Sequence, residues 1–334
     1  MMSFQLGGMT VYGYGLALAV SCAIAFFLMA RSMRRAGLKE NTASLVAVLS
    51  VPMGIFGARL FYCLIRWSWF WDQGAGFFVQ LTSGGLNLYG AVFFVILAGV
   101  LGARLSGQKP SRVLDAMVIP GCVMLILEHL CVGIAGQGYG WTVGDWFSVD
   151  AFDAEEYTGM SLFHLEDVSF FEGFPFSQMD YYGEYHWSVF LLEALIAVLM
   201  LVVLLRYKPM PDGRLALIFM VLMAPAEAIG ESMRQDAVLR WGFVRVGQLI
   251  TVCVLLAVLT RACVKSVHTP IRKKVLAYVY LILSMGVFMA MEFALEKKIV
   301  FLAFMPMDTC YVVMGLSCLG MTRSVLPMVH RMET

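Results

Sequence analysis

The sequence contains a series of long apolar segments, each close to 20 residues, separated by short polar stretches. A helix rises about 1.5 Å per residue, so about 20 apolar residues cross the roughly 30 Å hydrocarbon core of a bilayer. Charged residues make up 14% of the chain, whereas soluble proteins have about 25%. The pattern excludes a soluble fold and predicts an all-α integral membrane protein with about nine transmembrane helices. We expect these at 11–30, 43–65, 84–103, 114–136, 187–205, 214–231, 246–262, 275–293 and 299–320.

Basic residues gather in alternate loops between these segments, and cytoplasmic loops are the ones that carry excess Lys and Arg. The pattern therefore predicts an N-terminus outside the cell and a C-terminus in the cytoplasm. The net charge of +1 gives no basic field, so no nucleic-acid partner is expected. The basic loop residues are Arg31, Arg34, Arg35, Lys39, Arg104, Lys109, Arg112, Arg206, Lys208, Arg214, Arg261, Lys265, Arg272, Lys273 and Lys274.

One long polar insertion, at about 138–186, falls outside the membrane in this topology. It is rich in Asp and Glu, contains no Lys or Arg, and carries several aromatic residues. We expect a small external arm or head. The alternative is an acidic loop that only satisfies the charge bias between the two sides of the membrane.

Several ionisable side chains lie inside the apolar segments, where they are costly unless they are paired or hydrated. Glu128 and His129 occupy the middle of the fourth segment. Glu227 and Glu231 share a helix face at i, i+4 spacing, and Arg234 follows closely. These groups are candidate functional residues, and the alternative is a polar contact between helices. Arg59, in the second segment, needs a carboxylate or a lipid phosphate as partner.

The order of short motifs along residues 1–262 resembles the prolipoprotein diacylglyceryl transferase family. The matching motifs are YGL at 14–16, GARL at 57–60, GGLNLYGA at 84–91, Asp115, GIAGQ at 133–137, the long insertion, ESMRQD at 231–236 and VGQ at 246–248. The resemblance implies a membrane domain at 1–262 with the insertion at about 138–186. Residues 263–334 then form two additional helices and a cytoplasmic tail.

The resemblance implies transfer of a diacylglyceryl group from phosphatidylglycerol to the lipobox cysteine of a prolipoprotein, in the bacterial cytoplasmic membrane. The implied partners are the phospholipid, the prolipoprotein and the membrane, and neither a metal nor a cofactor is expected. The implied catalytic residues are Tyr89 and His129. The implied lipid-binding residues are Tyr14, Arg59, Glu128, Gln137, Glu227, Glu231, Arg234 and Gln248.

Several positions depart from the motifs of that family, and both asparagines of its motif at 128–137 become apolar here. Tyr89 stands where the family has its catalytic histidine, His129 where it has a lipid-binding arginine, and Glu227 where it has a second arginine. Three functions therefore stay open. The chain is a divergent transferase, a non-catalytic relative that binds lipid or lipoprotein, or a transporter with an ionisable pathway through Glu128, His129, Glu227 and Glu231.

Overall fold

The computed structural model describes residues 3–6, 9–80, 85–144, 169–180, 182–207, 213–235, 239–241, 244–298, 302 and 305–333. Within this part of the chain, eight helices have the length and apolar composition to cross a membrane, and a ninth apolar helix has 17 residues. They are α1 (Gly13–Arg35), α2 (Glu40–Ile65), α4 (Leu88–Leu105), α5 (Pro110–Ile134), α8 (Val189–Leu205), α9 (Arg214–Met233), α10 (Val246–Lys265), α11 (Ile271–Leu295) and α12 (Met307–His330). The protein is an all-α integral membrane protein, as predicted.

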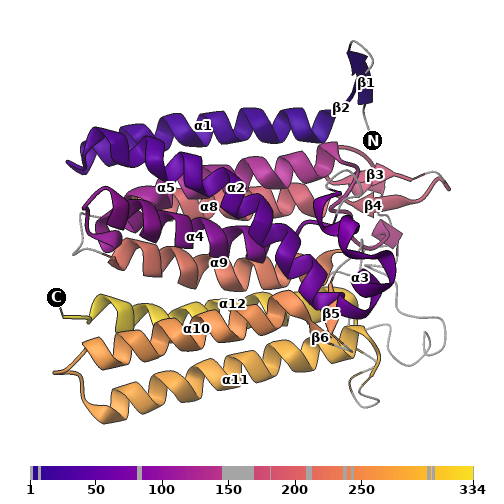
Figure 1. The fold of residues 1–334 in the computed structure, drawn as a ribbon. Helices are drawn as coiled ribbons and strands as arrows, with labels where there is room; N and C mark the ends of the chain where they lie inside the picture. Colours follow the sequence, from indigo (N-terminus) through magenta and orange to yellow (C-terminus); the bar gives the residue numbers. More distant parts are fainter. Residues whose placement is uncertain are drawn as a thin grey trace.

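The remaining elements are short. They are three hairpins, β1 (Ser3–Leu6) with β2 (Met9–Tyr12), β3 (Ser177–Met179) with β4 (Tyr185–Trp187), and β5 (Arg240–Trp241) with β6 (Val244–Arg245), together with α3 (Trp67–Gln73), η1 (Ala75–Val79) and η3 (Ser169–Phe171). The long helices run side by side, with the N-terminus and the hairpins at one end of the bundle and the C-terminus at the other (Figure 1). Two opposite ends are what an odd number of crossings requires.

The last helix lies further along the chain than expected. It was predicted at 299–320, but α12 spans Met307–His330. Pro306 is its N-cap, and proline favours a helix start while forcing the residue before it out of the helical region. Asp308 in the first turn adds the negative charge that a helix N-terminus favours. Residues 299–301 of the apolar run lie outside the described part of the chain.

Two contacts between helices position the centre of the bundle. Helices α2 and α4 meet backbone to backbone, because a Cβ on Gly90 would lie 2.4 Å from the carbonyl oxygen of Gly57. The carboxylate of Asp115 in α5 accepts the backbone N–H groups of Gly213 and Ala216, at 2.5 and 2.8 Å. It thus satisfies donors that a helix leaves free at its start, here the start of α9.

The main hydrophobic core joins residues of α5, α8, α9, α10, α11 and α12 into one cluster. The buried side chains of Leu255 in α10, Leu281 in α11 and Met314 in α12 belong to it. The last two helices are therefore packed into the same core as α9 and α10, and Figure 1 shows α10, α11 and α12 together on one side of the bundle.

Candidate functional site: a buried cluster of carboxylates around His129

The imidazole of His129 lies at the centre of a buried polar cluster between α5, α8 and α9. Its Nδ1 atom is 3.4 Å from Oε2 of Glu193, and its Nε2 atom is 3.3 Å from Oε1 of Glu227. All three side chains are buried, and His129 is 2% exposed. Both ring nitrogens thus face carboxylate oxygens, which matches the two N–H donors of an imidazolium.

The local sequence leaves room for this arrangement. A Cβ on Gly230 would lie 2.5 Å from Oε1 of Glu193, so the absence of a side chain there lets the carboxylate lie against α9. A small cavity of about 10 Å³ adjoins the cluster, lined by apolar residues together with His129, Glu193 and Glu227. That is room for about one water molecule.

Arg234 and Glu128 extend the cluster toward its edges. Nη1 of Arg234 is 3.7 Å from Oε2 of Glu193, so this carboxylate has two cationic neighbours. Oε2 of Glu128 is 3.5 Å from Nδ1 of His129. Tyr14, at the start of α1, lies within electrostatic range of Glu128. The structure thus brings Glu128 and His129 of α5 together with Glu227 and Arg234 at the end of α9.

A second part of the cluster forms around the start of α10. An added Cβ on Gly247 would lie within 2.4 Å of both the Tyr89 hydroxyl and Oε2 of Glu231, so these two groups come together over this glycine. The buried amide of Gln248 follows, and its nitrogen and oxygen have no hydrogen-bond partner among the described residues. A buried polar group without a partner is unusual, and an incoming ligand would satisfy it.

Arg59 in α2 makes several contacts with backbone carbonyls. Its buried guanidinium donates to the backbone carbonyls of Phe78, Gln80 and Gly85, at 3.2, 3.0 and 3.0 Å. These contacts hold the segment before α4, whose N-cap is Asn87. Through these three hydrogen bonds Arg59 orders the backbone that leads to Tyr89. Gln137 lies exposed just beyond the end of α5.

Sequence reasoning missed two buried carboxylates. Glu193 is 5% exposed and touches both His129 and Arg234, and Glu292 in α11 is 2% exposed and lies 2.6 Å from Nε of Arg245. Each is an ionisable group inside an apolar helix, the same signal that identified Glu128. The search for ionisable residues inside apolar segments was therefore sufficient to find both carboxylates.

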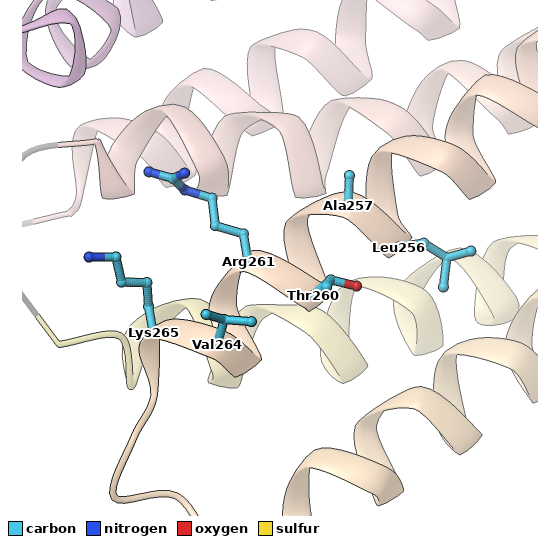
Figure 2. A pocket seen from close by; sticks show the side chains of 6 residues that line it. All are labelled: Leu256, Ala257, Thr260, Arg261, Val264 and Lys265. Atoms are coloured by element: carbon cyan, nitrogen blue, oxygen red, sulfur yellow. The ribbon is translucent and has the colours of Figure 1, made fainter.

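Two other features lie apart from the cluster. On the β3–β4 hairpin, the N–H groups of Glu184 and Tyr182 donate to Asp180 and hold the pKa of its carboxyl below the usual range. Figure 2 shows a surface hollow lined by one face of α10, with Arg261 and Lys265 near the cytoplasmic end predicted for that helix. The hollow is lined by Leu256, Ala257, Thr260, Arg261, Val264 and Lys265.

The composition of the cluster limits its chemistry. Within the described chain it brings together the carboxylates of Glu128, Glu193, Glu227 and Glu231 with two basic groups, His129 and Arg234. Such a group can accept and release protons. A phosphate would find its main cation in Arg234, whose planar guanidinium suits that anion.

Comparison with known proteins agrees with the motif order. The family described as prolipoprotein diacylglyceryl transferase matches residues 1–264, which include α1 to α10 and leave α11 and α12 outside. A phosphatidylglycerol–prolipoprotein diacylglyceryl transferase of Bacillus licheniformis is 25% identical over 258 residues, covering 76% of this chain and 88% of the relative.

Two further relatives have the same name. The protein of Shouchella clausii is 27% identical and that of Staphylococcus aureus 23% identical, each over 256 residues and 76% of this chain, covering 85% and 84% of the relatives. With four fifths of its length matched by the family, the chain belongs to the prolipoprotein diacylglyceryl transferases.

Proposed function

We propose that the protein transfers a diacylglyceryl group from phosphatidylglycerol to the lipobox cysteine of prolipoproteins, in the cytoplasmic membrane of a bacterium. The observation that carries the proposal is that the family match covers every helix contributing to the buried cluster. The names of the relatives supply the two substrates, phosphatidylglycerol and a prolipoprotein. The apolar helices provide the bilayer setting that both substrates share.

The reaction forms a bond between the cysteine sulfur and the terminal glyceryl carbon, and it breaks the bond from that carbon to the phosphate oxygen. Glycerol phosphate leaves with the electron pair, and the thiol proton needs an acceptor because the thiolate is the nucleophile. We assign that acceptor to the group formed by His129, Glu193 and Glu227, in which both carboxylates lie within 3.4 Å of the imidazole.

We assign the contacts with the lipid from the position of each residue in the cluster. Arg234 contacts the phosphate of the lipid, because it is the guanidinium that borders the His129 group. The hydroxyl of Tyr89 and the amide of Gln248 are buried and have no partner among the described residues, so they hydrogen-bond the lipid head group. Tyr14, Arg59, Glu128, Gln137, Glu227 and Glu231 remain proposed lipid contacts.

The test is complementation of a bacterium depleted of its own diacylglyceryl transferase. We expect the full chain to restore a diacylglyceryl adduct on the N-terminal cysteine of a reporter lipoprotein, read as intact mass. His129→Ala should remove it, because the proton-accepting group then loses the imidazole at its centre. The matched control is His268→Ala, a histidine that is 89% exposed and pairs with Glu333 at the other end of the bundle.

Expression and membrane insertion are confirmed by immunoblot of the membrane fraction. A wild-type chain that is inserted but forms no adduct would overturn the proposal. The excess of carboxylates over cations favours one alternative, a relative that binds lipid without turning it over. Retention of labelled phosphatidylglycerol by the purified wild type, without product, would establish that alternative.

A further inference from the structure

Glu292 is a buried carboxylate of α11. Helix α11 lies outside the part of the chain that the family matches. One oxygen of Glu292 is 2.6 Å from Nε of Arg245, and the other accepts a hydrogen bond from the hydroxyl of Ser232. Arg245 is 3% exposed, so the two opposite charges are removed from solvent together.

Arg245 in turn holds the end of α9. Its Nη1 donates to the backbone carbonyl of Glu231 and to that of Arg234, the second at 3.2 Å. The last carbonyls of a helix lack partners within the helix, and a cation is favoured at that end. Glu231 and Arg234 are the two residues whose side chains border the Tyr89 and His129 parts of the site.

Helix α12 supports the same turn of α9. The Tyr311 hydroxyl donates to the backbone carbonyl of Ser232 at 3.1 Å and accepts from the indole of Trp141 at 3.2 Å. Ser232 is therefore fixed by its side chain to α11 and by its backbone to α12. Both added helices contact the one turn that connects the two parts of the site.

We propose that Glu292 is a positioning residue for this site, acting through Arg245 to fix the C-terminal turn of α9 that carries Glu231 and Arg234. The inference rests on the proposed transfer reaction. It gives the two helices beyond the family match a role in the reaction. Without the carboxylate, Arg245 loses its counter-ion and the end of α9 loses its anchor.

The experiment compares purified full-length variants reconstituted in phosphatidylglycerol-containing vesicles with a lipobox peptide as acceptor. We expect Glu292→Gln to lower kcat by about tenfold or more, because small displacements of site groups are costly, and to change KM little. Glu292→Asp, which keeps the charge, should recover most of the activity. The effect of Glu292→Gln should vanish when Arg245→Gln is already present, since Glu292 acts through Arg245.

The matched control is Glu296→Gln. Glu296 lies one turn further along the chain from Glu292 and pairs with Arg240 at 2.9 Å, but that arginine is exposed. The Glu296→Gln variant should leave kcat unchanged. A Glu292→Gln enzyme as active as Glu296→Gln would overturn the inference, and so would an equal loss in both Arg245 backgrounds.

A second measurement does not depend on activity. Hydrogen exchange of the backbone amides in residues 231–235 should accelerate in Glu292→Gln and stay unchanged in Glu296→Gln. If the wild type transfers no lipid, the proposed function fails. The exchange experiment still decides whether Glu292 fixes this turn. Equal exchange rates in Glu292→Gln and Glu296→Gln would overturn the positioning role of Glu292.

Discussion

At the scale of single residues, Glu193 is the side chain on which the cluster most depends. It faces both His129 and Arg234, at 3.4 and 3.7 Å. Glu193→Leu removes the carboxylate that lies between the buried His129 and the partly exposed Arg234, so we expect a destabilisation of about 3 kcal/mol and loss of transfer. Thermal unfolding in detergent measures the loss of stability. The intact mass of the reporter lipoprotein measures the loss of transfer.

Glu184→Leu is the control for Glu193, because it removes a carboxylate from an exposed turn. It should leave the unfolding temperature and the transfer unchanged. If Glu193→Leu unfolds at the wild-type temperature, the cluster does not depend on this carboxylate.

The sequence identified part of this site in advance. Glu128, His129, Glu227 and Arg234 were recognisable as ionisable groups in or beside apolar segments, and they lie together. Their partner Glu193 belongs to a different helix, and no local spacing links it to His129. The carbonyl contacts of Arg59 were not predictable either, because these carbonyls belong to a segment whose path depends on tertiary packing.

At the scale of elements, α2 and α4 cross backbone to backbone at Gly57 and Gly90. An added Cβ on Gly90 would lie 2.4 Å from the Gly57 carbonyl oxygen, so the two backbones would have to separate. We expect Gly90→Ala to destabilise the protein by about 2 kcal/mol, the usual effect of overpacking. The measurement is thermal unfolding in detergent.

Gly286→Ala provides the comparison, since an added Cβ at Gly286 in α11 meets nothing within 4 Å. Alanine has the higher helix propensity, so this variant should be at least as stable as the wild type. Equal stability of the two variants would contradict the close crossing of α2 and α4.

Helix positions were mostly predictable from apolar length, because each helix has to span the same hydrocarbon thickness. The exception was α12, where hydropathy alone placed the start too early in an apolar run that ends at Pro306. The proline and the following Asp308 were the better signals, since they act on the backbone and on the helix dipole. Hydropathy indicates which residues can be in the membrane, and capping residues indicate where a helix begins.

At the scale of the whole molecule, the opposite ends of the bundle carry opposite kinds of loop. One end has the short connections that hold the basic residues, and the other has the hairpins (Figure 1). The positive-inside rule places the first end in the cytoplasm and the hairpins with the site's edge outside. Cysteine reporters at two exposed positions test this orientation, Glu184→Cys in the β3–β4 turn and His268→Cys between α10 and α11.

A membrane-impermeant maleimide applied to intact spheroplasts should label the Glu184→Cys variant at once, and the His268→Cys variant only after the membrane is permeabilised. The wild type measures labelling of the native cysteines, of which Cys253 is exposed on the surface of α10. Labelling in the reverse order would invert the orientation. It would also separate the site from the outer leaflet, because Glu231, Arg234 and the start of α10 lie on the hairpin side, where a prolipoprotein emerging across the membrane would have to reach them.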